Sequence, residues 1–113
     1  MKTITAAQLK EIMAKDGGLT VLDVRPPARY AEKHVPGAIN APATDDFGTS
    51  LSAAALGTDA HLVLYADHEA DDAHVKTLCE IATKAGYADA RCLMGGFMGW
   101  MEAGGTIEGG QES

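Results

Sequence analysis

The sequence predicts an α/β domain whose strands form a largely parallel sheet. Short apolar and β-branched runs at residues 20–24, 61–65 and 90–94 alternate with segments of helical periodicity. The 113 residues, 46% of them hydrophobic, match the size of one domain and provide enough apolar surface for a core. Alternating strands and helices are typical of parallel sheets, which carry their functional loops at the carboxyl ends of strands.

The first helix is predicted to begin at Thr5. Thr5 and Gln8 have the spacing of a capping box, in which each side chain bonds to the backbone N–H of the other residue. Ile4 and Leu9 have the spacing of a hydrophobic staple across the same helix start. Residues 16–18, Asp-Gly-Gly, are expected to end the helix, because glycine readily adopts the left-handed conformation found there.

The next segments predict a strand, a short helix and a turn. Two prolines at 26 and 27 should stop the strand over 20–24 and begin a short helix that runs through Lys33. Residues 35–39, VPGAI, predict a turn into a short extended segment. Residues 51–56 predict one or two helical turns.

The second half predicts two strands and two helices. The strand over 61–65 should lead through an acidic loop into a helix over 72–85, which Gly86 closes. The strand over 90–94 should be followed by a short helix over 97–103, with a Gly-Gly pair on either side.

Charge and composition argue against several classes of partner. The formal net charge is −7 and the pI is about 4.8, which disfavours nucleic acid and anionic membranes. Apolar runs are too short to span a bilayer, and the first residues lack the apolar run of a secretory signal. We expect a cytoplasmic protein that binds neither nucleic acid nor membrane, with one domain over 1–108 and a flexible tail over 109–113.

Three segments of the chain resemble the rhodanese (sulfurtransferase) family. They are LDVR at 22–25 followed by HVPGAIN at 34–40, the strand and loop beginning with VLYA at 63–66, and LMGGFMGW at 93–100. The segments occur in the family's order. The resemblance implies a five-stranded, mainly parallel sheet flanked by helices on both faces.

The resemblance also identifies a missing nucleophile. In the family, a cysteine begins the loop after the central strand, takes a sulfane sulfur from a donor such as thiosulfate, and passes it on from a persulfide. Backbone N–H groups of the loop and the following helix hold the anionic sulfur, and no cofactor is implied. Here this position is Ala66, and alanine has no nucleophilic atom. The resemblance therefore implies the family fold without its catalytic residue.

The chain departs from the family pattern at two further points, and both concern charge. Arg29 stands where many relatives carry an acidic residue, and the loop has four carboxylates and no Lys or Arg. Neighbouring carboxylates repel one another and any anion between them, so this loop should be a poor host for thiosulfate. The active-site-like loop consists of Ala66, Asp67, His68, Glu69, Ala70, Asp71 and Asp72.

The acidic loop has three interpretations. Asp71 or Asp72 can cap the following helix, which the frequency of such caps favours. His68, Asp71 and His74 are weak candidates for a metal site, since no zinc spacing is present. A binding site for a basic peptide or another partner is the third.

The remaining motif residues are expected to be structural. The resemblance implies that Asp23 and Arg25 form a charged pair that ties neighbouring loops together. His34 should be a hydrogen-bonding residue of a loop, and Trp100 a core residue. The full set comprises Asp23, Arg25, His34, Gly37, Gly95, Gly96 and Trp100.

Neither cysteine is expected to be a nucleophile. Cys79 lies on an apolar helical stripe and is expected to face the core, whereas Cys92 lies within a strand, away from the loop in sequence, and strand alternation leaves its face open. Met94, Met98 and Met101 fill core gaps or form a contact surface near the loop.

Three functional hypotheses follow. The leading hypothesis is a binding or regulatory module, inactive as a sulfurtransferase, for an unidentified protein or small-molecule partner. The second is a thiosulfate or persulfide sulfurtransferase whose native residue 66 is cysteine, with alanine as an introduced replacement. The third is metal binding at the acidic loop.

Overall fold

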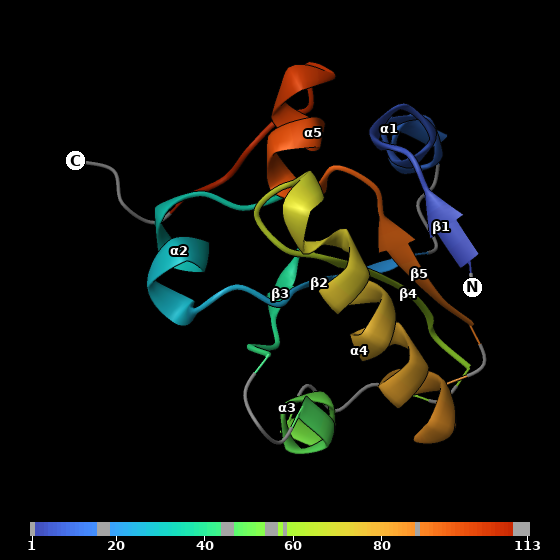
Figure 1. The fold of residues 1–113 in the computed structure, drawn as a ribbon. Helices are drawn as coiled ribbons and strands as arrows, with labels where there is room; N and C mark the ends of the chain where they lie inside the picture. Colours follow the sequence, from blue (N-terminus) through green and yellow to red (C-terminus); the bar gives the residue numbers. More distant parts are fainter. Residues whose placement is uncertain are drawn as a thin grey trace.

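The computed structural model describes residues 2–15, 19–43, 47–53, 57, 59–87 and 89–109. Five strands form one sheet in the order β1-β5-β4-β2-β3, and every neighbouring pair is parallel (Figure 1). The strands are β1 (Lys2–Ile4), β2 (Thr20–Asp23), β3 (Ile39–Asn40), β4 (His61–Tyr65) and β5 (Asp89–Leu93).

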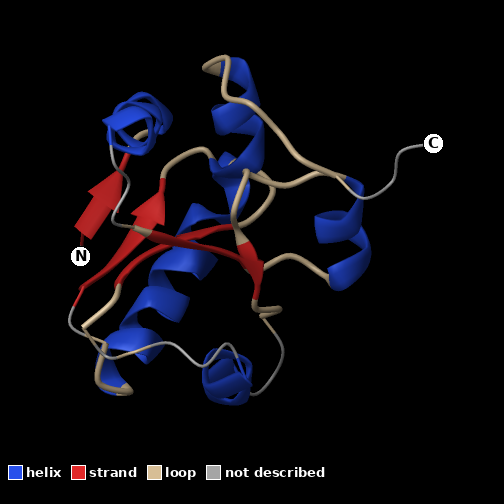
Figure 2. Cartoon of the chain, turned by 180° about the vertical axis from the view of Figure 1, so that it is seen from behind, coloured by secondary structure: helices blue, strands red, loops and turns tan. Residues whose placement is uncertain are grey.

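Helices cover both faces of the sheet. Figure 1 and Figure 2 show α1 and α5 on one face, and α3 and α4 on the other. The helices are α1 (Ala6–Lys15), α2 (Pro27–Glu32), α3 (Phe47–Ala53), α4 (Asp72–Lys84) and α5 (Gly96–Glu102), with a 3₁₀ turn, η1 (Glu69–Asp71), before α4.

The central strand β4 is buried on both of its faces. Leu62 and Leu64 contribute to the core beneath α3 and α4, whereas Val63 and Tyr65 contribute to the core beneath α1 and α5. Alternate side chains of a strand point to opposite faces. A strand covered on both sides therefore shows a continuous apolar run, as this one does.

The predicted start of the first helix is confirmed. The Thr5 backbone N–H donates to Gln8 Oε1 at 2.9 Å, and the Gln8 N–H donates to Thr5 Oγ1 at 3.1 Å. Ile4 and Leu9 are both buried in the same core. Residues 16–18, the predicted end of this helix, lie outside the described residues.

Two predictions about the elements were incomplete. The strand β1 was not predicted, because only Ile4 of its three residues is buried and its formation depends on pairing with the distant β5. The helix predicted over 51–56 begins earlier, at Phe47, where the side chain is buried in the core. Residues 54–56, and 110–113 of the predicted tail, lie outside the described residues.

Within the described part of the chain, the structure contains no helix that is long and apolar enough to cross a membrane.

Candidate active-site loop

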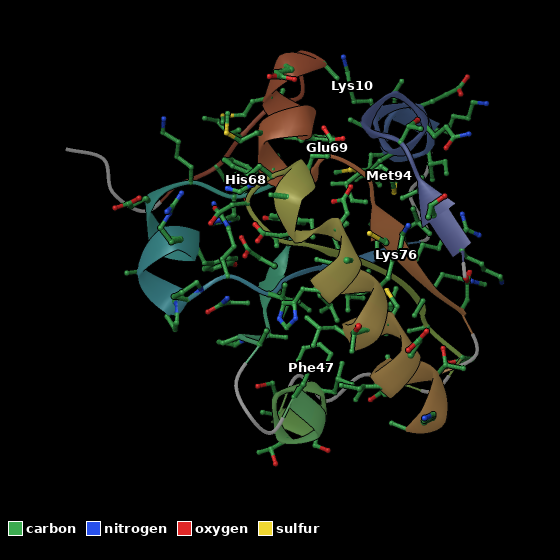
Figure 3. The ribbon with its side chains drawn as sticks, viewed as in Figure 1. Lys10, Phe47, His68, Glu69, Lys76 and Met94 are labelled. Carbon is green, nitrogen blue, oxygen red and sulfur yellow. The ribbon has the colours of Figure 1, made fainter. Side chains whose placement is uncertain are left out.

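The loop that follows β4 lies where the carboxyl ends of three strands meet. The strand β4 is central, with β5 on one side and β2 on the other. Its last residue, Tyr65, lies opposite Asp23 at the end of β2. Figure 3 shows His68 and Glu69 at the turn that follows β4, beside α5. Chain segments that are distant in sequence therefore converge at residue 66.

A buried ion pair supports this end of the sheet. Arg25 Nη2 lies 2.7 Å from Asp23 Oδ2, and Arg25 Nε lies 3.0 Å from Asp23 Oδ1. The Tyr65 hydroxyl donates to Asp23 Oδ2 at 2.7 Å and accepts the Val35 N–H at 3.1 Å. The Asp23 carboxylate thereby receives hydrogen bonds from two side chains, which satisfies a charge that would be costly to bury alone.

Arg25 also joins the elements around the loop. Its Nη2 donates to the Lys33 carbonyl at the end of α2, and its guanidinium carbon lies 4.5 Å from the centre of the Phe97 ring in α5. Burial lowers the pKa of Arg25, but the hydrogen bonds and charge of Asp23 outweigh burial and raise this pKa above its ordinary value. Arg25 is therefore a permanent cation that fixes β2, α2 and α5 relative to one another.

The start of α5 binds the loop backbone directly. The Phe97 N–H donates to the Ala66 carbonyl and the Met98 N–H to the Asp67 carbonyl, both at 2.9 Å. Gly96 allows this approach, because a Cβ there would lie 2.8 Å from the Ala66 oxygen and 2.8 Å from the His68 nitrogen. The first turn of α5 thus sets the path of the loop.

One of the four loop carboxylates, that of Asp67, is paired with arginines from outside the loop. Asp67 Oδ1 lies 3.1 Å from Arg29 Nη2 and 3.4 Å from Arg25 Nη1. The expectation of a loop with unbalanced negative charge was therefore wrong for Asp67, because tertiary structure supplies two arginines that the loop itself lacks.

The expectation that Asp71 or Asp72 caps α4 was also wrong. Asp71 occupies the cap position, but α4 has no side-chain cap hydrogen bond. The buried Asp72 carboxylate instead accepts the N–H of Gly95, at 3.1 and 3.3 Å from its two oxygens. Asp72 therefore connects the start of α4 to the turn that precedes α5.

A pocket of about 240 Å³ opens beside the loop, between α2 and α5. Its surroundings combine cationic, anionic and apolar side chains. The lining residues are Arg25, Arg29, Glu32, Lys33, Asp67, His68, Phe97, Met98 and Met101.

A family model for the rhodanese-like domain matches residues 5–103. The chain belongs to the rhodanese-like domain family. This assignment agrees with the parallel sheet and with the order of the three motifs.

Two curated relatives, the same protein from two strains, match this rhodanese-like domain over most of its length. A Mycobacterium tuberculosis protein named "Putative thiosulfate sulfurtransferase SseB" is 31% identical over an alignment of 137 positions, which covers 97% of this chain and 47% of the relative. The chain thus spans about half the length of the curated relatives it matches.

Solved structures show the same fold. The rhodanese-like domain of Anabaena Alr3790 superposes with a TM-score of 0.83 at 24% identity, covering 96% of this chain and 80% of that one. A protein from Lactobacillus plantarum superposes with a TM-score of 0.75 at 28% identity, covering 94% of this chain and 87% of that one.

The candidate metal ligands of this rhodanese-like domain do not gather into a site. His68 Nδ1 lies 3.7 Å from Asp71 Oδ2, and His74 is exposed on α4. Among the described residues, no three His, Cys, Asp or Glu side chains are placed to hold a metal ion.

Both cysteines are buried; this was expected for Cys79, whereas the sequence left the face of Cys92 open. Burial raises the pKa of Cys79 to about 12 and that of Cys92 to about 11, with smaller contributions from neighbouring negative groups. Cys92 Sγ faces the Asp72 carbonyl at 3.8 Å. Neither thiol has the exposed, electropositive setting of a nucleophile.

The other motif residues contribute to hydrogen bonding, to the core or to turns. His34 Nδ1 bonds to the Tyr30 carbonyl at 2.7 Å, and Trp100 is 2% exposed. Gly37 has a φ of 81°, in the left-handed region. Of the three methionines, Met94 packs against a core, whereas Met98 and Met101 line the pocket.

Lys33 and Phe97 were not identified as site residues from the sequence, and Arg29 was noted only as a departure from the family pattern. All three line the pocket. Local sequence patterns contain no signal for this, because the pocket forms only when α2 and α5 meet over the loop.

Proposed function

We propose that this rhodanese-like domain does not transfer sulfur and instead works as a binding module at the pocket beside residue 66. One observation carries the proposal: the residue that starts the loop after β4 is Ala66, while both thiols of the chain, those of Cys79 and Cys92, are buried. Sulfur transfer through a persulfide needs an accessible thiolate, because the thiolate is the nucleophile. The raised pKa values of Cys79 and Cys92 keep both thiols protonated near neutral pH.

The surroundings of Ala66 support a binding role. The loop is held by the two backbone hydrogen bonds from α5, and Arg25 is fixed by Asp23 beneath it. Binding sites are concave and combine apolar side chains with a few placed polar groups. The adjacent pocket has both kinds of side chain, so recognition does not depend on a reactive residue.

A paired sulfur-transfer assay tests the proposal. The wild-type chain, Ala66→Cys and Ala66→Ser would each be mixed with thiosulfate and cyanide, and thiocyanate would be measured. We expect no thiocyanate above the buffer blank from the wild type or from Ala66→Ser, since neither has a thiol in the loop. Turnover by the wild type at a rate comparable to that of an active rhodanese run in parallel would overturn the proposal.

The Ala66→Cys variant distinguishes a loop that lacks only its nucleophile from a loop that no longer accepts the sulfur donor. A persulfide detected by intact mass on this variant would indicate a competent loop that lacks only its nucleophile. A silent but folded variant would indicate that the surroundings of residue 66 no longer accept the donor.

The alternative is a sulfurtransferase whose native residue 66 is cysteine. The relative's name supports this alternative, since it refers to thiosulfate sulfurtransferase activity. Sequencing codon 66 in the source gene decides between the two: an alanine codon favours the binding module, and a cysteine codon favours the enzyme.

A further inference from the structure

Two methionines of α5 form an apolar ridge at the surface. Met98 is 46% exposed and Met101 is 37% exposed. Residues at this spacing share one face of a helix, and we call the pair the α5 ridge. Methionine is enriched in protein interfaces, because its flexible thioether side chain adapts to partners of different shape. The α5 ridge is therefore a candidate contact surface.

A recess of about 180 Å³ adjoins the α5 ridge, between η1 and α5. Figure 3 shows His68 and Glu69 at this place, beside α5. Gly95 and Gly99 also line the recess, and neither has a side chain that would fill it. Met98 belongs to the same lining, so one long side chain of a partner can contact both the ridge and the recess.

Two exposed carboxylates, those of Glu69 and Glu102, border the recess. Within the described part of the chain, neither of them takes part in an ion pair. The third titratable residue of the lining is His68, whose Nδ1 atom lies 3.7 Å from Asp71 Oδ2. The recess therefore presents negative charge that its own lining does not compensate, and such charge attracts a cation.

The pocket beside residue 66, which the α5 ridge also borders, adds no net positive charge. Its two arginines are already paired, Arg25 with Asp23 and Arg29 with Asp67. One lysine and one glutamate complete its charged lining, and their charges have opposite signs. The surroundings of the ridge are therefore negative overall, in a chain whose formal net charge is −7. Charge complementarity favours a basic partner.

We propose that the α5 ridge and the recess form a docking surface for a basic segment of another protein. A Lys or Arg side chain of the partner lies along Met98, with its charged end near the carboxylates of Glu69 and Glu102. Long basic side chains pack their methylene groups on apolar surface while the charged end stays hydrated. This docking surface goes beyond the proposed function, because it uses a different recess and does not depend on the absence of sulfur transfer.

Titration with a synthetic peptide tests the docking surface. The probe is an acetylated and amidated peptide of two Arg-Leu-Gly repeats, and the control peptide has Glu in place of Arg. Binding is measured by calorimetry and by methyl NMR of the methionines in about 0.1 M salt, where charges more than about 10 Å apart are largely screened. We expect only the arginine peptide to bind. It should shift the methyl signals of Met98 and Met101 and leave that of Met13, on α1, unchanged.

The matched variants Glu69→Gln, Glu102→Gln and Glu80→Gln each remove one exposed carboxylate. We expect each of the first two to weaken binding of the arginine peptide about twofold to fivefold, the range of an exposed ion pair. Glu80 lies in the second half of α4 and outside the recess, so Glu80→Gln should change the affinity less than about 1.5-fold. Met98→Gln should also weaken binding, because it removes apolar contact without changing the charge.

Several outcomes would overturn the docking surface. Equal weakening by Glu80→Gln and Glu69→Gln would show that the peptide is attracted to an acidic protein without a defined site. Absence of binding, equally tight binding of the glutamate peptide, or unshifted methyl signals of Met98 and Met101 would each refute it as well. Sulfur transfer by the wild type would overturn the proposed function alone, whereas failure of the peptide titrations would overturn the docking surface alone.

Discussion

Arg25 and Asp23 bind each other inside the protein, with side chains that are 3% and 0% exposed. Removal of one member of a buried pair leaves the other charge without compensation. We therefore expect Arg25→Met to lower the free energy of unfolding by about 3–5 kcal/mol, measured by urea denaturation at pH 7. Arg29→Met is the control, since this exposed arginine should cost less than about 1 kcal/mol. Similar losses in the two variants would contradict the structural role of Arg25.

Gly96 is predicted to be the least replaceable glycine near the loop. A Cβ at this position would lie 2.8 Å from the Ala66 carbonyl oxygen, and its φ of 60° is unfavourable for other residues. We expect Gly96→Ala to destabilise the fold by about 3 kcal/mol or more, from overpacking added to backbone strain.

Gly37→Ala provides the matched control for Gly96. Its φ is 81°, but a Cβ there would meet no heavy atom within 4 Å. It should therefore cost only the backbone term of about 1–2 kcal/mol. Thermal unfolding of both variants measures the difference, and equal costs would show that the contact with the loop is unimportant.

Asp89 is predicted to make the free energy of unfolding depend on pH in the acid range. Burial raises the pKa of its carboxyl, but hydrogen bonds from His61, Arg91 and Lys2 outweigh burial and lower this pKa from 3.8 to about 2. A carboxyl group that is more acidic in the folded state stabilises that state while it is ionised. Its contribution is complete above pH 4 or so and is lost as the pH falls from about 4 to about 2.

Asp89→Asn tests this pH dependence. We expect the variant to be less stable than the wild type by about 1–2 kcal/mol at pH 7, less than the full pKa shift implies because its partners are partly exposed. The difference should shrink as the pH falls from about 4 to about 2. Urea denaturation across this range, with Glu80→Gln as an exposed control, measures it. A difference that stays constant between pH 7 and pH 2 would refute the electrostatic explanation.

Features determined by neighbouring residues could be predicted from the sequence. The capping box of Thr5 and Gln8 depends on residues three positions apart, and both of its hydrogen bonds are present. The strand β4 was predicted at its observed bounds, because its apolar run ends where the acidic loop begins.

Features determined by distant residues could not be predicted. Asp67 was taken as part of an unbalanced acidic loop, and its arginine partners come from the segment after β2 and from α2. Asp72 was expected to serve its own helix, but it binds the backbone of Gly95. In both cases the sequence identifies a carboxylate near a helix start. Only the packing of α2 and α5 decides which hydrogen-bond donor this carboxylate contacts.

The position of β1 has a consequence for the order of folding. Among the described residues, β1 pairs with β5 alone, with Lys2 opposite Arg91 and Ile4 opposite Leu93. On the ribosome, this edge strand therefore waits without its partner until almost the whole domain has been synthesised. Closing such a long loop is entropically costly and slows folding. Completion of the sheet is thus a late event, which leaves β1 available to chaperones until β5 emerges.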